Sequence, residues 1–68
     1  MNELKIIGKN IARLRKLRKL TQEDLCGLVQ IDRSYLSEIE NGKMNVTIRS
    51  LVTIAKGLKV NLIDLLKN

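Results

Sequence analysis

The sequence predicts an all-α fold, a compact five-helix bundle that forms one domain over residues 1–68. Apolar residues recur at steps of three and four, which is the period of an amphipathic helix. Residues that favour helix N-termini stand just before several of these apolar series, at Thr21, Asp32, Thr47 and Asn61. The composition, without Pro, Trp or Phe and with a single Tyr, suits packed helices better than a sheet.

The first helix is expected from about Glu3 to Lys19, with an apolar stripe that includes Ile7 and Ile11. Thr21 is expected to cap the second helix, which ends near Val29. Asp24 follows three residues after Thr21, as the shorter version of a capping-box partner.

Asp32 is expected to cap the third helix, which Asn41 and Gly42 end because glycine accepts a left-handed backbone. Thr47 is expected to cap a fourth helix over about residues 48–58, and Asn61 a short fifth helix. The inner stripe of the fourth helix is predicted to be Leu51, Ile54, Ala55 and Leu58.

The charge is strongly positive and unevenly spread. The chain has 13 basic and 7 acidic residues, a net charge of +6. The first helix carries most of the excess, since Glu3 is the one acid among several cations. A basic charge of this kind favours binding to a polyanion, of which nucleic acid is the commonest. The alternative is that the cations form a solvated helix face that binds nothing.

Several kinds of chemistry are not expected. Cys26 is the one cysteine and there is no histidine, so neither a disulfide within the chain nor a metal cage is expected. Without histidine, the thiol has no general base in prospect, and an enzyme is not expected. We expect no cofactor and no small-molecule ligand, and no membrane association because no apolar stretch is long enough. The lone thiol fits a reducing cytoplasm.

The second and third helices carry the functional signal, over about residues 21–41. Their connection, Gln30 to Asp32, is only three or four residues long, so the two helices must cross steeply. That is the geometry of a DNA-binding helix-turn-helix. The positions that must pack hold suitable side chains: Leu25, Cys26, Val29, Ile31, Leu36 and Ile39. Cys26 is interpreted as a core residue, with a redox switch as the alternative.

Nearly the whole chain resembles the Cro/CI-type helix-turn-helix regulators. The matching runs are residues 11–15, 20–25, 35–43 and 51–58, together with Leu65 and Leu66. Residues 33–45 look most like the controller proteins of restriction–modification systems. One residue departs from the family, because Gln30 stands where glycine is usual. A non-glycine residue with positive φ costs about 1 kcal/mol, so either the turn is adjusted or the fold tolerates the strain.

The third helix is expected to enter the major groove and read bases. Its polar residues share one arc, while Leu36 and Ile39 lie opposite. Arg33 can hold guanine, contact a phosphate or remain a free surface arginine, and Ser34 can meet a base edge or a phosphate. Glu38 can accept from cytosine, orient Arg33 or pair with a lysine. Tyr35 can meet a phosphate or a thymine methyl group, or pack on the flank. The expected base-contacting residues are Arg33, Ser34, Tyr35, Ser37 and Glu38.

Other residues are expected to hold the DNA backbone or to support the helix. The resemblance implies phosphate contacts at Gln22 and in the loop after the third helix; the candidates are Gln22, Asn41, Lys43, Asn45 and Arg49. It also implies a partly buried ion pair between Arg15 and Glu40.

The predicted function is a sequence-specific transcriptional regulator, a repressor or controller that binds double-stranded DNA. Two copies would read an inverted repeat with half-sites about one DNA turn apart. The homodimer surface is expected within residues 48–68, at Leu62, Ile63, Leu65 and Leu66. The alternative is an antitoxin or adaptor whose DNA binding is secondary, because the fold serves both.

Overall fold

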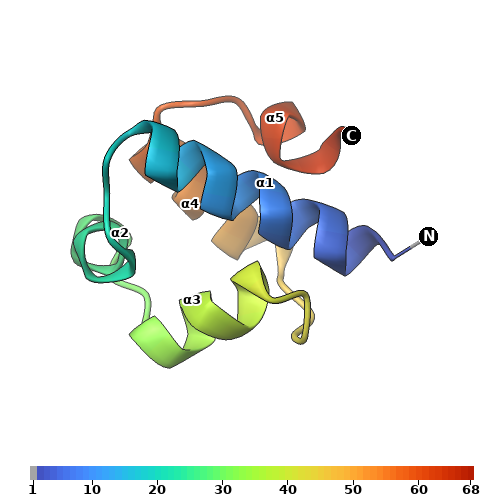
Figure 1. Cartoon of the computed structure of the whole chain (residues 1–68), viewed down its shortest axis with the longest axis horizontal. Helices are drawn as coiled ribbons and strands as arrows, with labels where there is room; N and C mark the ends of the chain where they lie inside the picture. Colours follow the sequence, from blue (N-terminus) through green and yellow to red (C-terminus); the bar gives the residue numbers. More distant parts are fainter. Residues whose placement is uncertain (1) are drawn as a thin grey trace.

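The computed structural model describes residues 2–68 and shows five helices within that range (Figure 1). They are α1 (Glu3–Leu17), α2 (Gln22–Val29), α3 (Arg33–Glu40), α4 (Ile48–Leu58) and α5 (Leu62–Leu66). All five expected helices are present, which confirms the predicted fold class. One expected end was wrong, because α1 stops at Leu17, before Lys19. Helix α3 ends at Glu40, just before Asn41 and Gly42, as expected.

Helix α1 organises the bundle. It runs through the middle of the molecule, with α3 below it, α5 above it and α4 behind it in Figure 1. It packs against α3, α4 and α5, while α2 packs against α3 and α4. The fully buried side chains come from every helix: Ile11, Leu25, Leu36, Ile39, Ile54, Leu58 and Leu65. Helix α3, the recognition helix expected from the sequence, therefore packs against both α1 and α2.

The predicted caps explain where the helices begin. The hydroxyl oxygen of Thr21 accepts from the N–H of Asp24 at 3.0 Å, and the N–H of Thr21 donates back to the Asp24 carboxylate at 2.8 Å. Asp32 and Thr47 accept from the first turns of α3 and α4. At α5, the N–H of Asn61 donates to the Asp64 carboxylate at 3.0 Å.

Three turns hold a non-glycine residue in the left-handed region. Lys19, Gln30 and Lys59 have φ of 58°, 55° and 59°. Gln30 is the residue that replaces the family's usual glycine, and the turn keeps the glycine-like geometry. The fold therefore tolerates the strain, which costs roughly 1 kcal/mol at such a position. Lys19 ends α1 in the same way, which is why that helix is shorter than expected.

The burial pattern corrects one member of the expected dimer surface. Leu65 is 0% exposed and belongs to the core, so it cannot face a second copy. Ile63 and Leu66 remain exposed, at 64% and 43%. Leu62 is partly buried against the core.

A buried amide fastens α5 to α1, and the sequence did not reveal it. Asn10 is 9% exposed. Its Nδ2 donates to the carbonyl oxygen of Leu65 at 2.9 Å and to that of Lys67 at 2.7 Å. Helix α5 has only five residues, so these two bonds and the buried Leu65 side chain keep it in place.

Candidate nucleic-acid interface

Helix α3 presents a polar face away from the core, as expected from its sequence. Arg33 and Ser34 are exposed, and Ser37 and Glu38 are half-buried, while Leu36 and Ile39 are buried on the other side. A short helix with one polar face and a buried apolar face can enter a major groove without losing its support.

Tyr35 lies on the flank of α3 and packs against the core. Its hydroxyl group is 3.5 Å from Oγ of Ser50, at the start of α4. Of the three roles weighed for this residue, the structure shows the packing on the flank. The weak contact to Ser50 leaves the hydroxyl group able to donate to another acceptor.

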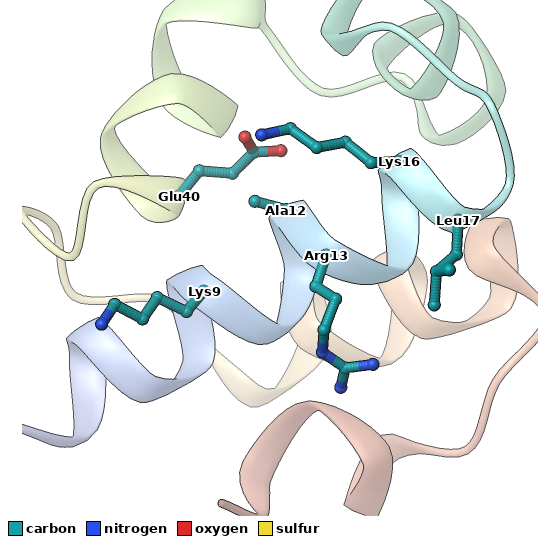
Figure 2. A pocket seen from close by; sticks show the side chains of 6 residues that line it. All are labelled: Lys9, Ala12, Arg13, Lys16, Leu17 and Glu40. Carbon is teal, nitrogen blue, oxygen red and sulfur yellow. The ribbon is translucent and has the colours of Figure 1, made fainter.

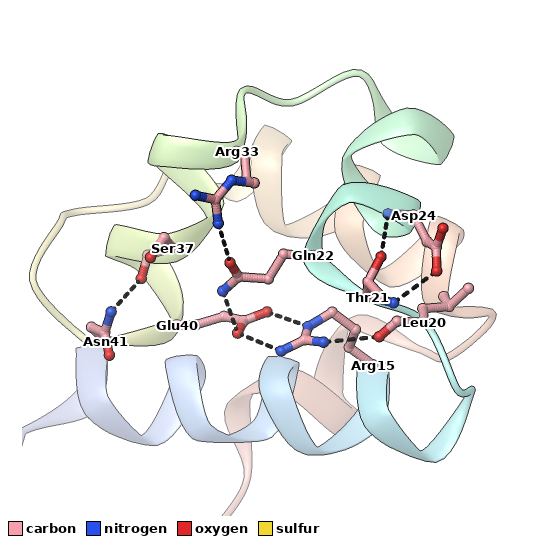
Figure 3. A network of polar contacts seen from close by, with 9 residues as sticks. All are labelled: Arg15, Leu20, Thr21, Gln22, Asp24, Arg33, Ser37, Glu40 and Asn41. Atoms are coloured by element: carbon pink, nitrogen blue, oxygen red, sulfur yellow. Dashed lines mark hydrogen bonds and ion pairs between the residues drawn. The ribbon is translucent and has the colours of Figure 1, made fainter.

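The expected ion pair between α1 and α3 is present and well formed. Nε of Arg15 donates to Oε2 of Glu40 at 2.7 Å, and Nη2 donates to Oε1 at 3.0 Å (Figure 3). The two side chains are 10% and 7% exposed. Arg15 also donates to the carbonyl oxygen of Leu20 at 2.8 Å, which ties the α1–α2 turn to the same point. The hydrogen bond to Glu40 raises the pKa of Arg15 above its usual value.

Gln22 extends this ion pair toward the exposed polar face of α3. Its Nε2 donates to Oε1 of Glu40 at 3.1 Å, and its Oε1 accepts from Nη1 of Arg33 at 3.1 Å (Figure 3). A continuous series of side-chain contacts therefore runs from α1 to Glu40 at the end of α3. It continues through Gln22 on α2 to Arg33 at the start of α3. Sequence reasoning placed Gln22 at a phosphate and missed this bridge.

Arg33 lies at the outer end of that chain. Its side chain is 60% exposed, and its Nε is 3.9 Å from the Glu23 carboxylate, which is 75% exposed. Water screens such an exposed pair, so the contact contributes little to stability. The guanidinium group is therefore oriented by Gln22 but still accessible.

Close packing also fixes the far end of α3. A Cβ atom added to Gly8 of α1 would clash with the carbonyl oxygen of Ile39 and lie 2.6 Å from that of Glu40. Only glycine permits this approach of α1 to α3. This contact could not be predicted from the sequence, because an isolated glycine inside an amphipathic helix can have many explanations.

The other candidate phosphate contacts surround α3. Asn41 donates its side-chain N–H to the carbonyl oxygen of Ser37 at 2.9 Å and so closes the end of α3. Lys43 and Asn45 are exposed in the following loop, and Arg49 is exposed in the first turn of α4. The exposed side chains of Lys43, Asn45 and Arg49 can turn toward a ligand.

Helix α1 carries a basic face, seen in Figure 2 around a shallow hollow. Lys16 extends toward Glu40 on the α3 side, and Arg13 points toward α5. The cations around this hollow therefore diverge, with Lys16 on the α3 side and Arg13 on the α5 side. Those on the α3 side are nearest to the expected DNA.

Cys26 lies half-buried against the core, and burial raises the pKa of its thiol. The raised pKa keeps the thiol protonated and poorly reactive at neutral pH. Within residues 2–68, no His, Cys, Asp and Glu side chains cluster as a metal ion would require. In the same range, no helix has the length and apolar character needed to span a membrane.

Comparison with known proteins agrees with this geometry. The model of the helix-turn-helix family HTH_3 matches residues 11–65. The control protein C.MunI from Mycoplasma sp. is 42% identical over 67 residues, which cover 96% of this chain and 90% of that protein. The crystal structure of the restriction-modification controller protein C.AhdI from Aeromonas hydrophila is 31% identical. It has a TM-score of 0.91 over 96% of this chain and 98% of the other.

A second solved structure shows a controller protein on DNA. The C.Esp1396I tetramer, in complex with its natural 35-base-pair operator, is 37% identical to this chain. Its TM-score is 0.84, with 98% of this chain and 99% of the other covered. The similarity extends over both chains almost completely.

Proposed function

The chain belongs to the helix-turn-helix family HTH_3, a family of DNA-binding regulators rather than enzymes, and we propose that it acts as a controller of transcription. In this proposal, it binds a double-stranded operator made of inverted half-sites. It would bind this operator in the cytoplasm, where bacterial DNA is located. One observation supports this proposal above the others. A series of contacts holds the exposed side chain of Arg33 at the start of α3, and it is formed by Arg15, Glu40, Gln22 and Arg33.

The proposed division of labour follows the exposure of each side chain. Arg33, Ser34, Ser37 and Glu38 read base edges from the outer face of α3. Tyr35 reaches the same groove from the flank, through its hydroxyl group. The proposed phosphate contacts are made by side chains around α3. They are the second Nε2–H of Gln22, which does not face Glu40, and the side chains of Asn41, Lys43, Asn45 and Arg49.

We propose that two copies associate through α5. Its exposed apolar side chains, Ile63 and Leu66, lie beside the half-buried Leu62, and together they form the α5 surface. The operator-bound tetramer of C.Esp1396I supports assembly on DNA. Two copies double the number of base pairs that α3 alone can read.

Selection of bound sequences from a random duplex pool tests this function. We expect an inverted repeat with half-sites about one DNA turn apart. Arg33→Ala should relax the preference at one base pair in each half-site by about 1–3 kcal/mol. Arg18→Ala removes the same charge at the end of α1, where Arg18 donates to the carbonyl oxygen of Lys59 and not to α3, and is the matched control. Selection of sequences without symmetry would contradict the dimer.

Salt dependence tests the phosphate contacts separately. The logarithm of the binding constant should fall by about 0.9 per phosphate neutralised for each tenfold rise in salt. Lys43→Gln should reduce this slope and weaken binding to all sequences alike.

Sedimentation equilibrium of Ile63→Ser tests the α5 surface. A dimer as strong as that of the parent chain would refute the proposed contact.

A further inference from the structure

A second surface lies between the ends of α2 and α4, away from α3. Two adjoining hollows share Leu28, Gly57 and Lys59. We call the joint surface the α2–α4 groove; its remaining lining residues are Arg18, Leu20, Val29, Gln30, Thr53 and Lys56. None of its lining residues belongs to α3 or α5. The groove is thus separate from both the proposed DNA face and the α5 surface.

The floor of the groove is apolar and open to solvent. Leu28 is 62% exposed, although it sits on a helix that packs into the core. It adjoins Leu20 and Val29, which are partly buried against the core. Single exposed leucines are ordinary, but a leucine that continues into a neighbouring apolar floor forms a patch. Such a patch can bury a partner's apolar side chain.

The rim of the groove carries one sign of charge. Arg18, Lys56 and Lys59 line it, and no Asp or Glu is among its lining residues. Nη2 of Arg18 donates to the carbonyl oxygen of Lys59 at 3.2 Å, which joins the end of α1 to the end of α4. These cations therefore line the same groove as Leu28, on a surface to which α3 contributes no residue.

We propose that the α2–α4 groove binds an acidic segment of a partner protein that inserts an apolar side chain beside Leu28. The cations on the rim complement the partner's carboxylates and speed its approach. A second copy of this chain is a poor occupant, because a symmetric contact would bring Arg18, Lys56 and Lys59 of the two grooves against one another. A nucleic-acid backbone would use the cations but leave Leu28 unburied.

The test uses the full chain and a labelled helical peptide of about four turns, with leucine at every third or fourth position and Asp or Glu between. Fluorescence anisotropy measures its binding. Leu28→Lys removes the apolar side chain and adds a cation. Leu17→Lys makes the same change at the end of α1, at a side chain that is 67% exposed and lines neither hollow of the groove. Thermal unfolding checks that both variants remain folded.

We expect Leu28→Lys to weaken peptide binding about tenfold, as the loss of one buried leucine side chain implies. Leu17→Lys should leave peptide binding unchanged, and Lys56→Glu should weaken it because the rim loses a cation. If Leu28→Lys binds the peptide as tightly as the parent chain or more tightly, the attraction is to charge alone and the proposal fails. Sedimentation of Leu28→Lys adds a second criterion, since loss of self-association would assign the groove to a second copy instead.

Discussion

Gln22 accepts a hydrogen bond from Nη1 of Arg33, with 3.1 Å between the two side-chain atoms. The orientation of the Gln22 amide has a clear cause. A carboxylate only accepts hydrogen bonds, so the amide nitrogen must face Glu40 and the amide oxygen must face Arg33. The buried pair of Glu40 and Arg15 therefore determines where the arginine proposed to read guanine is held.

We predict that Gln22→Ala weakens discrimination at the base pair read by Arg33 by about 1 kcal/mol, because the free guanidinium group must be ordered on binding. Competition assays with operators changed at single positions would measure this. The matched control is Gln30→Ala, which removes another glutamine side chain outside α3. A uniform loss of affinity at every position would show that Gln22 serves a phosphate only.

The ion pair makes a second prediction, about stability. Removing one partner leaves the other charge buried, so Arg15→Leu and Glu40→Leu should each lower the free energy of unfolding by about 3–5 kcal/mol. The double variant should lose less than the sum of the two. Urea unfolding monitored by circular dichroism measures each value. Additive losses would show that the two side chains contribute independently.

Two glycines in helices should respond in opposite directions to the same change. Gly8→Ala should destabilise by about 1–3 kcal/mol, because the new methyl group meets the backbone of α3. Gly27→Ala should stabilise by about 0.5–1 kcal/mol, because nothing lies within 4 Å of the new Cβ atom and alanine favours a helix. Thermal unfolding of both variants provides the comparison. Equal effects would contradict the close packing of α1 on α3.

The amide of Asn10 is expected to control the position of α5. Asn10→Ala leaves the carbonyl groups of Leu65 and Lys67 without their donor, and should cost about 1–3 kcal/mol. In this variant, the amide hydrogen exchange rate should rise more in α5 than in α3, and sedimentation should show weaker self-association. Asn41→Ala is the control, because that exposed side chain makes its one bond within α3. If α5 keeps its protection, the buried Leu65 side chain alone holds it.

Stability should decline in acid. Backbone hydrogen bonds from Thr21 and Asn61 hold the pKa of Asp24 and of Asp64 below the usual range. A depressed folded-state pKa contributes stability that is fully present above the unfolded value, about 3.9, and lost as pH falls through the folded one. The melting temperature should therefore stay level near neutral pH and fall below about pH 4. A double change, Asp24→Asn with Asp64→Asn, should make that fall shallower.

The helices could be predicted because their signals are local. Thr21 with Asp24 and the apolar stripe of α4 are visible within a few residues of sequence. Contacts between distant segments were not visible: Asn10 meets Leu65 and Lys67 across more than fifty residues. Leu65 was misplaced because a five-residue helix with four apolar side chains does not show which of them faces the core. The ion pair of Arg15 was expected through the family resemblance alone.

Within the proposed site, the residue types were predictable but their partners were not. The periodicity of α3 separated its polar face from Leu36 and Ile39. Nothing local indicated that Gln22 would bridge Glu40 and Arg33, since the three residues lie on two helices and the geometry depends on how those helices cross.

The mounting of α3 also limits how its specificity can be redesigned. Ser34, Ser37 and Glu38 make no side-chain bond to another helix among the described residues, so they are exchangeable positions. Glu40 is not exchangeable, because it must match Arg15 on α1 and Gln22 on α2. Transplanting the recognition helix of another regulator onto this scaffold therefore requires that the donor helix retain a glutamate at this position, whatever operator it reads.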